Sequence, residues 1–283
     1  MVTSFDNMFK GAELFTGKGL DVWITSSLVS LFGTFEKAAA MNVDLRSWQT
    51  TGVTTMYQTF FGATTFVGAG LDEWDTVMVT DLSATFKDAP QMNSDLSAWN
   101  VAKVTKMAGT FRGAEDFVGT GLRSWNVAKV TDMDGAFRNV AKMNSYLGEW
   151  NVAEVTSLAA TFSGASKFDG SGLTKWDVAK VARFKDTSTL TFDDATSLTS
   201  CRKREIADAW KSNAAFNSGG DFGARKYVTD WASETCAVRL RFARAAYART
   251  LLCIQLSVPY IGSYDVSRAR KRMYARRSLH APT

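Results

Sequence analysis

Histidine and cysteine are scarce in this sequence, and their scarcity excludes several kinds of active site. The only histidine is His280, close to the end of the 283 residues. Ser-His-Asp and Cys-His sites need a histidine beside the nucleophile, so we expect no enzyme of either class. The three cysteines, Cys201, Cys236 and Cys253, lack metal-site spacing, and we expect them to be thiols. We therefore predict a protein without catalytic activity, metal or cofactor.

Long apolar runs are also missing from the sequence. No stretch approaches the roughly 18 apolar residues that a membrane-spanning helix needs, so we expect no span. The first residues, MVTSFDNMFKG, have neither the basic start nor the apolar stretch of a signal peptide. Hydrophobic residues make up 46% of the chain and charged residues 22%, which is typical of a folded protein.

Positive charge is concentrated at one end of the chain. Residues 225–283 hold 12 of the 33 Lys and Arg and 3 of the 28 acids, which leaves 21 basic and 25 acidic residues in 1–224. A mildly acidic body thus carries a basic tail. Its run RARKRMYARR, residues 268–277, has the composition that binds nucleic acid or an anionic membrane. A solvated, partly helical or disordered tail is the alternative.

Tryptophan marks an internal repeat. Seven tryptophans follow one another at alternating intervals of 25 and 26 residues: Trp23, Trp48, Trp74, Trp99, Trp125, Trp150 and Trp176. The alternation reflects two kinds of coil. Glycine-type coils read F-x-G-x-G-L-x-x-W, and asparagine-type coils read M-N-x-(D/Y)-L-x-x-W. The G-x-G pair recurs in each glycine-type coil but never forms part of a G-x-G-x-x-G phosphate-binding motif. We therefore expect it to form turns and not to bind phosphate.

Each coil combines a strand-like and a helix-like pattern. The segment L-x-x-W-x-V predicts a short parallel strand, and V-T-x-M-x-x-x-F-x-x-A predicts a short helix. Neither element can bury its apolar face alone, so stacking must bury it. The sequence therefore predicts an α/β repeat solenoid, leucine-rich-repeat-like, of about 7.5 coils. We expect its core to contain Trp48, Trp74, Trp99, Trp125, Trp150, Trp176, Phe86, Phe111 and Phe137.

The stretches WNVAKVTKMAGTF and LSAWNVAKVTKM resemble a known repeat. They are similar to the 26-residue repeat of the BspA-like leucine-rich-repeat group of bacterial surface proteins. The resemblance extends over residues 2–198. It implies a leucine-rich-repeat-like solenoid, a cell-surface or secreted location, and a role in adhesion or partner binding. The family has no catalytic residues to carry over.

Three domains are expected along the chain. Residues 1–198 form the solenoid, which begins with an uncovered coil at Val2. Residues 199–216 form a C-terminal capping helix, with Thr199 or Ser200 as its N-cap and with Ile206 and Trp210 on its apolar edge. Residues 217–283 form the basic tail.

The variable residues of the repeat point to a binding surface. In an L-x-x-W-x-V strand the two residues before tryptophan face solvent, and they differ from coil to coil while the core positions recur. Mixed charge on a continuous face suits a protein or glycan partner, and an ordinary solvated surface is the alternative. The candidate partner-binding residues are Arg46, Asp72, Glu73, Arg123, Glu149 and Lys175.

Two further columns of polar residues recur through the repeat. From Trp48 to Trp176, the residue after each repeat tryptophan is Asn, Asp or Gln, and we expect these side chains to hydrogen-bond between coils. Calcium is not expected there, because no D-x-D-x-G pattern is present. Threonine recurs at positions that we interpret as helix caps and helix-to-backbone donors. Threonine ranks also occur in ice-binding proteins, which makes ice binding a remote alternative.

Overall fold

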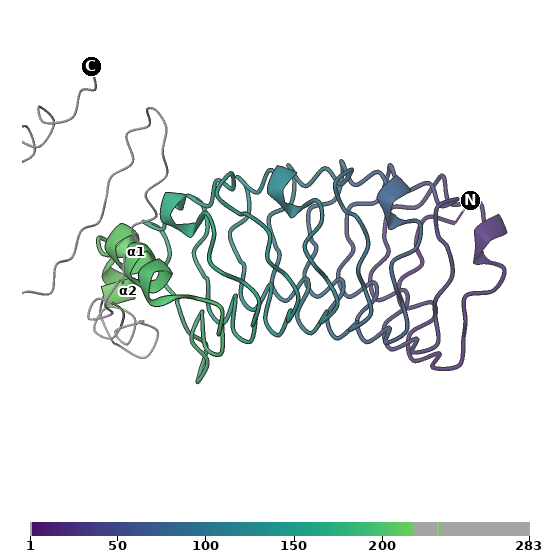
Figure 1. Cartoon of the computed structure of the whole chain (residues 1–283). Helices are drawn as coiled ribbons and strands as arrows, with labels where there is room; N and C mark the ends of the chain where they lie inside the picture. The colour runs from purple at the N-terminus through teal and green to yellow at the C-terminus, as the bar shows by residue number, and fades with distance from the viewer. Residues whose placement is uncertain (1, 218–230, 232–283) are drawn as a thin grey trace, which may run out of the picture. The chain divides into compact units, whose positions relative to one another are not determined.

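The computed structural model describes residues 2–217 and Trp231. The chain divides into two units, residues 1–235 and 236–283, and the described residues belong to the first. Except for Asn217 and Trp231, the basic tail predicted over residues 217–283 therefore lies outside the described residues. Within the first unit the 25- and 26-residue coils lie side by side, and two short helices follow the last coil (Figure 1).

A column of isolated parallel β-bridges joins successive coils in the register of the repeat. The column runs through Ser4, Ser30, Thr55, Asp81, Lys106, Asp132, Ser157 and Arg183. These residues belong to the V-T-x-M segment, where the sequence predicts the start of a helix. The prediction of a strand at L-x-x-W-x-V is therefore wrong, because the parallel pairing occurs in the other half of the coil.

The predicted short helix is a ladder of tight turns. In one glycine-type coil, the amides of Thr110, Arg112 and Ala114 each donate to the carbonyl three residues earlier. Amides between these turns donate instead to the next coil, as Gly109 N does to Asp134 O at 2.7 Å. Gly109 has φ 62°, a backbone conformation that a right-handed helix excludes. The helix prediction is wrong because half of the backbone donors pair between coils.

The predicted strand is replaced by a turn that buries leucine and tryptophan together. In the glycine-type coils this turn is a 3₁₀ helix: η1 (Leu20–Val22), η2 (Leu71–Glu73), η3 (Leu122–Ser124) and η4 (Leu173–Lys175). The glycine before each has positive φ, for example 91° at Gly121. In the asparagine-type coils a turn without 3₁₀ assignment brings Trp99 N to Leu96 O at 3.1 Å.

Aromatic ladders run through the core. The nine tryptophan and phenylalanine residues expected there are all buried, with at most 4% of any of them exposed. Trp99 and Trp125 stack with ring centroids 6.2 Å apart, and Phe111 stacks on Phe86 and Phe137 at 5.6 Å. Each indole also donates to the leucine carbonyl of the preceding coil, as Trp125 Nε1 does to Leu96 O at 3.1 Å. The ladders thus combine apolar burial with satisfied indole N–H groups.

The threonine columns join coils and do not cap helices. In one column, Thr131 Oγ1 donates to Thr105 O of the preceding coil at 3.2 Å. In the other, buried Thr110 donates to Leu82 O at 3.1 Å and to Met107 O at 2.8 Å. Our expectation of helix caps was therefore wrong, since no helix begins at these positions. The Thr110 column is buried, whereas Thr80, Thr131 and Thr156 of the other column are exposed.

The polar column after tryptophan is local. Asn100 Oδ1 accepts the amide of Ala102, two residues on, at 3.1 Å, and Asn126 and Asn151 make the same bond in their own coils. The expectation that these side chains bond between coils is wrong. A side-chain oxygen at this place reaches the nearby amide of its own turn, which competes with contacts to the next coil.

Helix α1 (Ser200–Trp210) follows the last coil and precedes the short α2 (Ala214–Asn217). Thr199 is the N-cap of α1, and its hydroxyl accepts the amide of Arg202. Trp210 extends the tryptophan ladder, because its ring stacks on Trp176 at 6.3 Å and its Nε1 donates to Leu173 O at 3.1 Å. Cys201 of α1 is disulfide-bonded, which corrects our expectation of thiols. Pairing depends on the fold and not on spacing alone.

Candidate partner-binding edge

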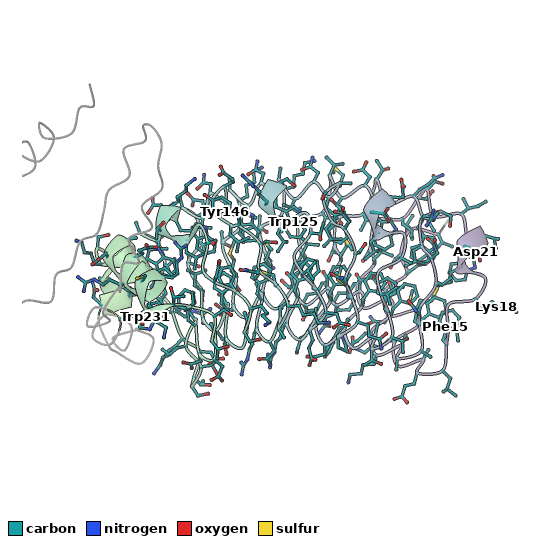
Figure 2. The ribbon with its side chains drawn as sticks, in the orientation of Figure 1. Phe15, Lys18, Asp21, Trp125, Tyr146 and Trp231 are labelled. Atoms are coloured by element: carbon teal, nitrogen blue, oxygen red, sulfur yellow. The ribbon has the colours of Figure 1, made fainter. Side chains whose placement is uncertain are left out.

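The turns between leucine and tryptophan lie on one edge of the stacked coils, which we call the turn edge. Neighbouring turns touch, since the amide of Leu96 donates to Thr120 O of the next coil at 3.3 Å. Figure 2 shows Trp125 and Tyr146 at the edge that carries η3 and η4. The turn edge presents all six candidate residues in exposed positions: Arg46, Asp72, Glu73, Arg123, Glu149 and Lys175.

A groove of about 670 Å³ follows part of the turn edge and includes two of the six candidates, Arg46 and Asp72. Val67 and Val118, from two glycine-type coils, line it together with Asn93 of the coil between them. Both valines are 42% exposed. Asn93 Oδ1 accepts the amide of Val118 at 3.1 Å, which joins two lining residues from neighbouring coils.

The groove carries charges of both signs. Arg46 pairs with Asp44 at 2.8 Å. Lys142 pairs with Asp116 at 2.8 Å. Asp95 accepts hydrogen bonds from the hydroxyl and the amide of Ser97, which lower the pKa of its carboxyl. Asp95 therefore stays ionised, and the groove offers carboxylates, cations, amides and two apolar side chains to a ligand.

A second cluster gathers three of the remaining candidates around Tyr146. The Arg123 guanidinium lies 5.2 Å from the centre of the Tyr146 ring, and Lys175 Nζ lies 5.5 Å from it. Lys175 also pairs with Glu149 at 3.5 Å. A hydrogen bond with the Tyr146 hydroxyl, followed by the Glu149 charge, raises the pKa of Lys175. We call Arg123, Tyr146, Glu149 and Lys175 the Tyr146 cluster.

Sequence reasoning missed Tyr146, although the sequence contains the signal. Tyr146 occupies the place in its asparagine-type coil that Asp44 and Asp95 occupy in the other two. An aromatic residue in place of a turn-capping acid could have been singled out. The sixth candidate, Glu73, is exposed on the turn edge but belongs neither to the groove nor to the Tyr146 cluster.

The described residues show neither a cluster of metal ligands nor a membrane-spanning helix. Residues 2–217 and Trp231 contain no group of three or more His, Cys, Asp or Glu that could hold a metal ion. Over the same residues, no helix has the length and hydropathy to cross a membrane.

Comparison with known proteins gives one match. A family model described as "Mycoplasma protein of unknown function, DUF285" matches three overlapping segments, residues 1–70, 44–120 and 116–231. The successive matches follow one another along the coils, as expected for tandem repeats. No curated protein and no solved structure matches the chain.

Proposed function

The chain belongs to the family described as "Mycoplasma protein of unknown function, DUF285", and we propose that it is a non-catalytic scaffold that binds a protein or glycan through its turn edge. In this proposal the tandem coils form a leucine-rich-repeat-like solenoid of the BspA-like kind. Stacked coils hold the exposed turn residues at fixed spacing, which suits an extended binding surface.

The groove is the observation that carries the proposal. It combines two exposed valines, Val67 and Val118, with charged residues of both signs within about 670 Å³. An apolar strip bordered by polar groups is the usual composition of a recognition surface. The same position in each coil varies in charge, so the edge can be specific while the core stays constant.

The disulfide of Cys201 supports a location outside the reducing cytosol. Disulfides persist in oxidising compartments, which include the cell surface and the secreted space. An extracellular location agrees with the resemblance to bacterial surface proteins, so we propose adhesion or partner binding at the cell surface.

A capture experiment with the full chain tests the proposal. The immobilised chain is exposed to surface and cell extracts, and bound species are compared between wild type and Arg46→Ser with Asp72→Thr. Both substitutions copy sister coils, which have Ser97 and Thr174 at these places, so the fold should tolerate them. We expect a captured species to be lost from the double variant.

Lys106→Ser is the matched control, because Lys106 lies in the bridge column and a sister coil has Ser157 there. The control should retain the captured species. Equal capture by the double variant would contradict binding through the turn edge. Capture that salt abolishes and the turn-edge changes leave intact would assign binding to the basic tail.

A further inference from the structure

Tyr146 departs from its sister coils at a cost to its own turn. Asp44 and Asp95, in the same position, each accept the amide two residues on, at 3.0 and 2.8 Å. A tyrosine cannot accept that amide, so this turn lacks the carboxylate cap. The ring instead contacts the cations of Arg123 and Lys175.

Gly148 makes the space that the ring occupies. A Cβ on Gly148 would lie 2.5 Å from Cζ of Tyr146, closer than any side chain can approach. Gly148 has no positive φ, so its backbone does not require glycine. The sister coils have Arg46 and Ser97 at this place. Tyr146 and Gly148 thus both differ from the sister coils at the place where the ring packs.

The two cations beside the ring differ in their remaining partners. Lys175 is engaged by Glu149 and by the Tyr146 hydroxyl. Arg123 is exposed and its guanidinium lies over the ring, and no carboxylate among the described residues pairs with it. Stacking on an aromatic face orients a guanidinium and leaves its N–H groups available for a planar, bidentate acceptor.

The surrounding charge selects the kind of acceptor. The Tyr146 cluster holds two cations, Arg123 and Lys175, and one carboxylate, Glu149, so it has one excess positive charge. This local field offers little to a polyanion such as a sulfated glycan or a nucleic acid, which needs several cations to neutralise it. It tolerates one carboxylate, whose planar fork matches the guanidinium. Arginine and tyrosine are also the residues that most often anchor protein interfaces.

We propose that Arg123, oriented by Tyr146, anchors an Asp or Glu carboxylate of a protein partner. The proposal rests on the proposed function, since it places a protein on the turn edge. It assigns Arg123 as the contact and Tyr146 and Gly148 as the residues that position it.

Arginine side-chain NMR of the full chain tests the proposal with a defined probe. N-acetylglutamate N-methylamide is titrated while the Nε–Hε signal of Arg123, assigned with Arg123→Lys, is followed. We expect a saturable shift that the uncharged glutamine analogue does not produce. Tyr146→Phe keeps the stacking ring and should keep the affinity, whereas Tyr146→Leu should weaken it roughly fivefold.

Equal shifts with the glutamine analogue, or equal affinities in the Phe and Leu variants, would overturn the proposal. Arg46, already paired with Asp44, serves as the internal comparison and should shift less. The capture experiment is a separate test. If the Arg46 and Asp72 double variant loses the partner, and Arg123 shows no preference for the carboxylate probe, only this inference is refuted. A carboxylate site at Arg123 without any turn-edge capture refutes the proposed function alone.

Discussion

At the scale of single residues, several buried polar side chains of this protein bond between coils. The indole of Trp125 and the hydroxyl of Thr110 both donate to carbonyls about one coil away. Such bonds satisfy backbone acceptors that would otherwise be buried without partners. Buried polar groups therefore specify the register in which coils stack.

Asp134 provides a pH-dependent test at this scale. Burial raises the pKa of its carboxyl, although the Ser157 hydroxyl and the Arg183 guanidinium oppose the shift. A raised pKa means that the folded state binds the proton more tightly, so this group stabilises the fold as pH falls through that pKa. We expect Asp134→Asn to increase the free energy of unfolding more at about pH 7 than at about pH 3. Urea denaturation at both pH values measures the difference.

Asp95 is the control of opposite sign. Hydrogen bonds from Ser97 lower the pKa of Asp95, so its contribution is present above the ordinary pKa of 3.8 and is lost as pH falls through the folded value. Asp95→Asn should therefore destabilise the protein near neutral pH and have less effect in acid. The same pH trend in both variants would contradict the two environments described here.

At the scale of elements, sequence reasoning identified the repeat and missed its backbone. Residue type alone predicts the register, the buried tryptophan and phenylalanine positions and the G-x-G turns. Buried positions are apolar in every coil, and positions with positive φ favour glycine. The helix did not follow, since apolar spacing of three and four residues fits a ladder of three-residue turns equally well. Gly109 and Gly113 were the overlooked signal, because glycine is unfavourable within a helix.

Replacing a glycine changes the free energy of unfolding in opposite directions for a ladder of turns and for a helix. Gly109 has φ 62°, and an added Cβ would meet only Arg112 Cβ, at 3.9 Å, so Gly109→Ala should cost about 1–2 kcal/mol through backbone strain alone. A helix at this position would instead gain roughly 1 kcal/mol from the same change. Chemical denaturation measures the difference. Ala84 has φ 54° at the matching place of another coil, and Ala84→Gly should be neutral or stabilising.

The candidate binding site was predictable only in part, for a physical reason. Exposed positions vary in residue type from coil to coil. The sequence therefore placed Arg46 and Asp72 on one edge but could not assign them to a groove. The groove depends on where valines of two glycine-type coils lie relative to Asn93 between them. The Tyr146 cluster depends on Gly148, whose role becomes evident only when the ring is placed against it.

At the scale of the whole molecule, the proposed function assigns stability and partner binding to different columns of residues. Trp125 is buried between neighbouring coils, and Trp125→Ala should cost about 3–5 kcal/mol. Arg123→Thr, two residues earlier, copies Thr174 of a sister coil and should change the free energy of unfolding by less than about 0.5 kcal/mol. Denaturation of both variants measures the contrast. A large loss of stability in Arg123→Thr would show that the turn edge is structural.

We propose that a partner binds the turn edge. Hydrogen–deuterium exchange of the full chain with the captured partner tests this binding most directly. We predict that binding slows exchange in peptides that contain residues 66–75 and 117–125, which span the groove and η3. Peptides of the bridge column around Lys106 should exchange at unchanged rates. Protection confined to the bridge column or to residues 236–283, with the turn edge unchanged, would contradict the claim.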